Sequence, residues 1–418
     1  MQDSFKSVAI NETNPKFTQC IKRKDSLYDR GNSIRSEFAR DYTRLIHCRA
    51  YRRLKHKTQV FCAPHNDHIC TRMEHVIHVA STSKTIANYL GLNAELTEAI
   101  ATGHDIGHAP FGHAGEDILN SLMSQKEGTN APKKFWHERN SLFFADFIET
   151  LGNPDGSENL LNLTYAVRDG IVCHCGEIDE QGIKPRDNAI DLYDIKRPGV
   201  VSPFTWEGCI VKVSDKIAFL GRDIEDARAY HIIDMSSYRE LREIVASTLG
   251  FDSKGGAHRS GRAVNTTVLM NDMIVDLCEQ SSPEKGICFS EPYFKFIQAL
   301  KKFSLARIYN NWRLLEFKNY AQGILGCIYR TLMRTQVYAQ NHRLDHALKY
   351  APDLRDSFLN WVIKYTNYDE EKRSVERFNT KNVFDINDSV SWEKCVIEYI
   401  SGMTDQYAIN VFNEIISF

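Results

Sequence analysis

The sequence predicts an all-α fold, a helical core followed by additional C-terminal helices. Two observations support this prediction. Apolar residues recur at steps of three and four in many segments, which is the spacing of an amphipathic helix. A sustained alternation of apolar and polar residues, the mark of a half-buried strand, is found nowhere in the 418 residues. We also find no internal repeat or low-complexity tract.

Composition limits the class of protein. Charged residues make up 25% of the chain and apolar ones 42%, values that are ordinary for a globular protein, and the net charge of −2 argues against whole-surface attraction to nucleic acid or membrane. No run of 18 apolar residues occurs, and the N-terminus lacks the apolar core of a secretory signal. The eleven cysteines are an odd number without dense spacing, which favours reduced thiols. We therefore expect a cytoplasmic protein without a membrane partner.

The first organised segment is basic. Residues 22–57 hold twelve Lys or Arg and four acidic residues, and the apolar positions of the stretch RDYTRLIHCRAYRRLKHKTQVF fit helical spacing. An isolated basic helix is usually a solvated face. Beside a metal site, a wall that binds a polyanion is the better interpretation.

A helix is predicted over residues 72–90, with a wide apolar face and a stop at Gly91. His75 lies on this helix beside the apolar stripe. A lone histidine at such a position is most often a core residue, so His75 gains functional weight only from its partners.

The stretch that carries the most chemistry is IATGHDIGHAPFGHAGEDILN, residues 100–120. Asn93 is a plausible N-cap for the helix that enters it, and the Gly and Pro residues after Asp105 forbid the continuation of that helix. His104 and Asp105 then close one helix, while His108 and His113 lie in the loop. A second helix is predicted from about residue 114, with Glu116 in its first turn. Imidazoles and carboxylates in this layout suggest a metal with a proton-transfer group nearby.

Residues 136–151 and 160–174 are predicted to be helical, and residues 176–206, rich in Pro and charge, to form a surface excursion. Cys173, His174 and Cys175 are a candidate for a second metal site. No further cysteine pair lies nearby at ligand spacing, so this alternative is the weaker one.

The next helix is predicted from residue 210. Asp215, Phe219 and Asp223 follow at i, i+4 and i+8 on a face beside the apolar stripe, and a carboxylate there needs a metal or a salt bridge to Lys212 or Lys216. Further helices are expected over residues 237–249, 264–278, 293–309 and 316–339. Between them, residues 252–263 form a basic loop that is either disordered or binds phosphate or nucleic acid across a subunit interface.

His75, His104, Asp105 and Asp215 together offer two imidazoles and two carboxylates from three helices. Such a mixed set suits one divalent transition metal, Mn, Fe, Co, Ni or Zn, with open positions for water and substrate oxygens. Mg is less natural beside two histidines.

Six stretches, in order between residues 35 and 227, carry a family resemblance: RDYTRLIHCRAYRRLKHKTQVF, HNDHICTRMEHVIHVASTSKTIA, EAIATGHDIGHAPFGHAGEDILN, FWHERNS, LNLTYAVRDGIVCH and VKVSDKIAFLGRDIEDA. The sequence resembles the HD-domain superfamily of metal-dependent phosphohydrolases and, within it, the deoxynucleoside triphosphate (dNTP) triphosphohydrolases. The resemblance implies that the metal ligands are His75, His104, Asp105 and Asp215. It also implies the catalytic residues His113 and Glu116, with His108 and His137 as further phosphate or acid/base groups.

For the substrate, the resemblance implies contacts from Gln59, Arg72, Lys216, Phe219 and Asp223. Gln59 matches a position that reads the sugar, and Arg72, Lys216 and Asp223 match positions that contact phosphates or the 3′-hydroxyl. Phe219 stands where relatives commonly have Tyr, which removes one hydroxyl contact. Arg222 stands where many bacterial members have His.

The expected reaction is metal-dependent hydrolysis of a dNTP to deoxynucleoside and tripolyphosphate. The resemblance also makes a homo-oligomer, a tetramer or hexamer, the expected assembly and a dNTP or single-stranded DNA a candidate effector. Another HD phosphohydrolase, a nucleotidase or phosphodiesterase, is the nearest alternative, and a nucleic-acid-binding oligomeric scaffold is the alternative of a different class. We expect an N-terminal extension over residues 1–34, an HD core over 35–230, and a C-terminal helical region over 231–418 packed on that core.

Overall fold

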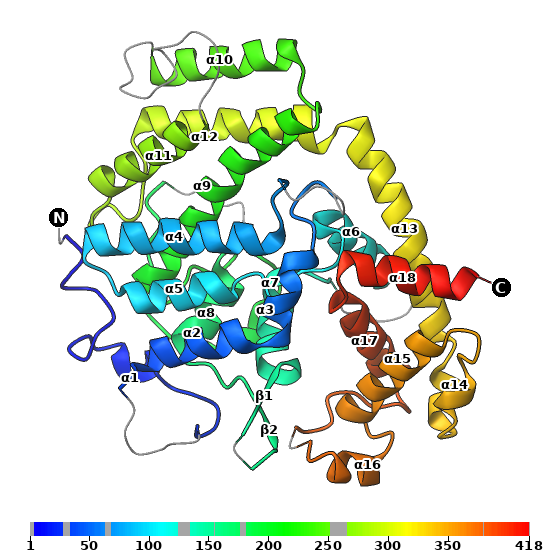
Figure 1. Cartoon of the computed structure of the whole chain (residues 1–418). Coiled ribbons are helices and arrows are strands. Elements are labelled where there is room, and N and C mark those ends of the chain that lie inside the picture. The colour runs from blue at the N-terminus through cyan, green and yellow to red at the C-terminus, as the bar shows by residue number, and fades with distance from the viewer. Residues whose placement is uncertain are drawn as a thin grey trace.

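The computed structural model describes residues 4–27, 34–62, 68–123, 134–153, 155–175, 181–250, 266–378 and 380–417. Helices dominate these residues, and their one sheet is a two-stranded hairpin. The all-α prediction is therefore confirmed. Figure 1 shows the helices of the N-terminal half stacked at the centre, with α10 to α12 above them and α13 leading to the C-terminal helices at the right. The basic loop predicted at 252–263 lies outside the described residues.

The N-terminal half supplies the elements around the candidate site. In chain order they are α1 (Phe17–Cys20), α2 (Glu37–His47), α3 (Arg49–Arg53), η1 (Leu54–His56), α4 (Arg72–Leu90), α5 (Ala94–Gly103), α6 (Gly112–Met123), α7 (His137–Phe143), η2 (Phe144–Ile148), β1 (Thr150–Gly152), β2 (Glu158–Leu160), α8 (Tyr165–Cys173), η3 (Leu192–Asp194) and α9 (Trp206–Ala229).

Local signals set several of these bounds. Thr71 and Glu74 form a reciprocal capping box at the start of α4, and Gly91, with a φ of 82°, ends that helix as predicted. Asn93 caps α5 by accepting a hydrogen bond from the Leu96 amide, also as predicted. Helix α6 begins at Gly112, earlier than predicted, so Glu116 lies in its second turn.

Two predicted helices are shorter than the sequence pattern suggested. Residues 136–151 form α7, then a π-helical turn (η2), and the chain enters β1 at Thr150. Strand β2 pairs with β1 in antiparallel register, and the next helix, predicted from residue 160, begins at Tyr165. The apolar residues of 136–151 have helical spacing, but the chain leaves the helix after Ile148 and forms a strand. Tertiary packing can override a local pattern in this way.

The C-terminal half is also helical. It comprises α10 (Met235–Leu249), α11 (Thr266–Gln280), α12 (Glu291–Ser304), the π-helical turn η4 (Leu305–Tyr309), α13 (Trp312–Met333), α14 (Gln336–Gln340), η5 (Leu344–His346), α15 (Pro352–Tyr365), α16 (Glu370–Val375), α17 (Ser389–Ser401) and α18 (Asp405–Ile416).

The apolar core is divided into three clusters, and all three cross the predicted boundary at residue 230. The largest joins Phe143 of α7 to Cys395 of α17. The second joins Ile86 of α4 to Leu241 of α10, and the third joins Ile118 of α6 to Ile324 of α13. Phe5, in the predicted N-terminal extension, is fully buried in the second cluster. The division into three regions stays a prediction, although the C-terminal helices do pack on the core. None of the described helices has the length and apolar character needed to span a membrane.

Candidate metal centre and active site

Three helices bring the predicted metal ligands together. Helix α4 carries His75, the C-terminal end of α5 delivers His104 and Asp105, and α9 delivers Asp215. Helix α4 packs against both α5 and α9, so residues far apart in sequence meet at one point. His75, His104 and Asp105 are buried, with 3%, 0% and 2% of their surfaces exposed, so the donors face the interior.

The donor atoms of His75, His104 and Asp215 lie within 4.8 Å of one another. Nε2 of His75 is 2.9 Å from Oδ1 of Asp215. The ring of His104 is oriented by its Nδ1, which lies 2.6 Å from the Ala101 carbonyl, and its Nε2 is buried without a hydrogen-bond partner. A buried imidazole nitrogen oriented in this way and lacking a partner is typical of a metal ligand, so the residues present fit a divalent ion.

Asp105, the fourth predicted ligand, lies in an overlapping cluster with His104 and His174. Its Oδ2 is 3.6 Å from Nε2 of His104 and accepts a 2.8 Å hydrogen bond from the Arg72 guanidinium. Burial opposes ionisation of this carboxyl, but His104 and Arg72 hold its pKa well below the ordinary value. Asp105 is thus a carboxylate suited to a metal, and Arg72 is its ion-pair partner.

The predicted catalytic pair lies beside this centre. Oε2 of Glu116 is 3.3 Å from Nδ1 of His113 and 3.1 Å from Nδ1 of His137. The side chain of His113 is 67% exposed and that of His137 only 8%. Burial disfavours the charged form of His137, yet Glu138 and Glu116 hold its pKa well above the ordinary value. A protonated His137, an ionised Glu116 and an exposed His113 therefore form one connected group.

His108 completes the histidine group. Its ring stacks on that of His137, with centroids 4.7 Å apart, and its buried Nε2 has no hydrogen-bond partner. Burial, followed by the nearby Arg72, lowers its pKa well below the ordinary value, so His108 is neutral. The loop approaches α7 closely at Gly107, where a Cβ atom would lie 2.2 Å from the Ser141 amide nitrogen. Only glycine permits this approach.

The predicted substrate contacts come from the segment before α4, from α4 itself and from α9. Gln59 is buried, its Oε1 has no partner, and its backbone carbonyl accepts a 3.1 Å hydrogen bond from Arg72. Lys216 and Phe219 are half-buried on α9. Asp223, one turn further, accepts a 2.5 Å hydrogen bond from the Tyr309 hydroxyl, and burial raises its pKa to about 6.

The sequence reasoning missed two residues at this site. His174, considered only for a second metal, has its Nδ1 2.7 Å from the Ile171 carbonyl and its Nε2 buried without a partner, as His104 does. The quoted stretch that ends in VCH contained this signal. Tyr309 comes from the π-helical turn η4, and no sequence signal links it to Asp223, 86 residues earlier.

Three side chains of the basic segment depart from the prediction. Arg44 donates to the carbonyls of Leu160 and Leu161, and Arg53 pairs with Glu149 at 2.8 Å. Lys57 is buried and donates to the backbone carbonyls of His108 and Ser401. These three side chains bind the protein itself, because buried backbone carbonyls and carboxylates require donors. They are not the polyanion wall that the charge run suggested.

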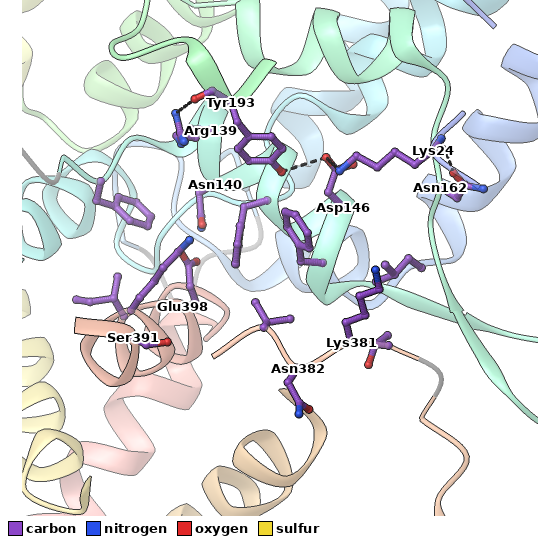
Figure 2. A pocket seen from close by; sticks show the side chains of 18 of the residues that line it. Lys24, Arg139, Asn140, Asp146, Asn162, Tyr193, Lys381, Asn382, Ser391 and Glu398 are labelled. Atoms are coloured by element: carbon purple, nitrogen blue, oxygen red, sulfur yellow. Dashed lines mark hydrogen bonds and ion pairs between the residues drawn. The ribbon is translucent and has the colours of Figure 1, made fainter. Parts of the chain in front are cut away.

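A separate cavity of about 1400 Å³ lies between α7, η2 and α17, and none of the predicted site residues lines it. Figure 2 shows Asp146 between Lys24 and Tyr193, which both reach its carboxylate, and Glu398 near Asn140. The candidate centre is therefore distinct from this cavity.

Buried His and Asp donors at the junction of three helices fit a helical metal-dependent hydrolase. Residues 72–220, a range that includes all four predicted ligands, match the HD domain. Two curated relatives are named deoxyguanosinetriphosphate triphosphohydrolase-like proteins. The one from Caldanaerobacter subterraneus subsp. tengcongensis is 30% identical over 382 residues, which are 91% of this chain and 85% of the relative. The one from Rickettsia canadensis is 30% identical over 407 residues, 94% of this chain and 97% of the relative. The chain belongs to this family of HD-domain phosphohydrolases.

Proposed function

We propose that this protein hydrolyses deoxynucleoside triphosphates at the α-phosphorus, giving a deoxynucleoside and tripolyphosphate. The observation that carries the proposal is the position of the Glu116 carboxylate, which joins His113 to His137 directly beside the buried His and Asp donors. The names of the relatives support a dNTP as the substrate.

In this proposal His75, His104, Asp105 and Asp215 hold one divalent ion, which is Mn, Fe, Co, Ni, Zn or Mg. When bound, the ion supplies positive charge to the phosphoryl oxygens and lowers the pKa of water. His174 is a further donor toward the same ion. The remaining chemistry is assigned to the chain's own side chains.

Glu116 orients His113 by its contact with Nδ1, which leaves Nε2 of this exposed imidazole for the substrate. Water adds its oxygen to the α-phosphorus, the bond from that phosphorus to the 5′-oxygen breaks, and one proton passes to the 5′-oxygen. In one route His113 donates this proton as a general acid. In the other route His113 attacks the α-phosphorus, the 5′-oxygen leaves and takes a proton, and water then breaks the phosphorus–nitrogen bond to release tripolyphosphate. His137, held protonated by its carboxylate neighbours, stabilises negative charge on the phosphate, and His108 lies against its ring.

Selection of the substrate is assigned to the remaining predicted residues. Asp223 accepts the hydrogen bond of the sugar 3′-hydroxyl, Gln59 reads the sugar, and Phe219 packs against it. Arg72 and Lys216 contact phosphates. We further propose a cytoplasmic homo-oligomer, a tetramer or hexamer, and a dNTP or single-stranded DNA as its effector.

The test is product analysis at early time points, with dGTP and each candidate metal in turn. The proposal predicts deoxyguanosine and tripolyphosphate in equal amounts from the first turnover. If dGMP or dGDP precedes deoxyguanosine, the bond assignment is wrong and another HD phosphohydrolase activity is supported. If no nucleotide is hydrolysed but DNA binds with a steep salt dependence, the nucleic-acid scaffold is supported.

A further inference from the structure

The corner between α17 and α18 meets the loop that carries His108. We call residues 104–111, between α5 and α6, the catalytic loop. Asp405, the first residue of α18, is 7% exposed, and its Oδ1 accepts a 2.8 Å hydrogen bond from the Phe111 amide. Its Oδ2 accepts from the Thr58 amide at 2.9 Å and from the Thr58 hydroxyl. One carboxylate therefore joins the end of the catalytic loop to the segment that precedes α4.

The loop needs such a partner at this point because its backbone is strained. Phe111 has a φ of 64°, in the left-handed region that is unfavourable for a residue with a side chain, and Gly112 follows with a φ of 63°. The hydrogen bond to Asp405 gives the buried Phe111 amide the acceptor that a buried amide needs. This bond fixes the two residues directly before His113, and so it fixes the direction in which the His113 imidazole leaves α6.

Two further side chains bridge the same loop to the same corner. Lys57 donates to the carbonyls of both His108 and Ser401, the last residue of α17. The Asn140 side chain donates to the Gly107 carbonyl at 2.7 Å and to the Ser401 hydroxyl at 3.1 Å. The loop is thus bonded directly at residue 111, and through the side chains of Lys57 and Asn140 at residues 108 and 107, to a corner that lies outside the HD-domain match at 72–220.

We propose that Asp405 is a positioning residue for the hydrolysis. It acts through the Phe111 amide and sets where His113 meets the substrate, so the C-terminal helices complete an active site that the HD domain alone does not hold in place. The inference rests on the proposed function, because it assigns the effect to His113.

The test uses Asp405→Asn, which keeps the size of the side chain. Its single acceptor oxygen cannot serve both the Phe111 amide and the Thr58 donors. The expected result is a fall in kcat of roughly tenfold or more at saturating dGTP, a KM within about threefold of wild type, and an unchanged metal content. The split between kcat and KM is the informative readout, since misplacement of a reacting group affects turnover more than binding.

Two matched variants separate positioning from stability. Thr58→Val removes one bond to the same carboxylate but leaves the Phe111 bond, and should keep kcat within about threefold. Asp388→Ala removes the N-cap of α17, where the Asp388 side chain accepts from the amides of Val390 and Ser391, and should lower Tm without changing kcat. If Asp405→Asn lowers Tm as Asp388→Ala does while kcat stays at the wild-type value, Asp405 is only structural and the proposal is overturned.

Hydrogen exchange tests the contact between Asp405 and the Phe111 amide independently of activity. The first measurement needs only the wild-type protein. The Phe111 amide should exchange as slowly as the buried amides of α18, and about tenfold or more faster in Asp405→Asn. Rapid exchange of Phe111 in the wild type would refute the contact even if the variant fails to fold. A wild type that hydrolyses no dNTP would defeat the proposed function instead, and a His113→Ala variant that is inactive while Asp405→Asn is fully active would defeat only the positioning role.

Discussion

Nδ1 of His137 lies 3.1 Å from Oε2 of Glu116, the same carboxylate oxygen that lies 3.3 Å from Nδ1 of His113. One buried and one exposed imidazole therefore share a single acceptor. The charge on His137 keeps Glu116 ionised despite its burial, and Glu116 in turn orients His113. The two histidines differ in exposure, so of the pair only His113 is open to a substrate.

Replacement of His113 should separate chemistry from binding. If this imidazole transfers a proton or attacks phosphorus, His113→Ala lowers kcat by roughly 10² or more while nucleotide still binds. Steady-state kinetics with dGTP and a direct binding measurement check both parts. His346→Ala, at an exposed histidine of η5, is the control and should behave as wild type. A His113→Ala enzyme with near-normal kcat would remove the residue from the chemistry.

Replacement of Asp105 tests the metal centre. Asp105→Ala should abolish both bound metal and turnover and leave the helical circular dichroism spectrum largely intact. The free energy of unfolding should fall by about 3 kcal/mol, because Arg72 is left buried without its 2.8 Å partner. Metal analysis after dialysis is the measurement, with Asp194→Ala on the exposed turn η3 as the control. Full metal occupancy in the Asp105 variant would show that this carboxylate is not a ligand.

Removal of the Tyr309 hydroxyl should change the pH dependence of kcat/KM. Asp223 is the proposed acceptor for the 3′-hydroxyl in its ionised form, and its pKa, raised to about 6 by burial, is held down in part by the Tyr309 hydrogen bond. Wild-type kcat/KM for dGTP should therefore fall below about pH 6. In Tyr309→Phe the pKa of Asp223 rises further, so the fall begins at a higher pH. The exposed Tyr320→Phe is the control, and identical pH profiles for both variants would contradict the role.

The same pocket should select against ribonucleotides. The resemblance implies a pocket too tight for a 2′-hydroxyl, and Asp223 lies two helical turns after Asp215 on the same helix. We expect kcat/KM for dGTP to exceed that for GTP by about tenfold or more, a difference of at least 1.4 kcal/mol in transition-state binding. Competition between the two nucleotides measures the ratio directly. Comparable values would overturn the sugar assignment.

Glu398, beside the cavity of Figure 2, should make stability depend on pH. Burial raises its pKa to about 7, whereas an unfolded glutamate has a pKa near 4.3. Between these values the folded state binds more protons than the unfolded state, so this residue's contribution to the free energy of unfolding decreases as pH rises from about 4.5 to 7. Glu398→Gln should remove on the order of 2 kcal/mol of that decrease. Urea unfolding at pH 5 and 7.5 checks it, and the exposed Glu371→Gln should leave the slope unchanged.

The sequence by itself determined the fold class, the bounds of α4 and the start of α5, and it predicted the candidate metal donors. Thr71, Glu74, Gly91 and Asn93 act within one or two turns of their own helix, so their effect could be predicted from neighbouring residues. The donors His75, His104 and Asp215 were predicted because their residue types and motif stretches were visible in the chain. Here the local signal and the tertiary structure agree.

Only the tertiary structure decided which side chains are committed to partners far away in sequence. Arg72 pairs with Asp105 across 33 residues, Tyr309 reaches Asp223 across 86, and Asp405 reaches Phe111 across 294. The basic residues Arg44, Arg53 and Lys57 resemble a surface charge run in sequence, yet they satisfy buried carbonyls and a carboxylate. The physical reason is that a buried polar group must find a partner wherever packing places one, and packing brings together residues that no local pattern connects.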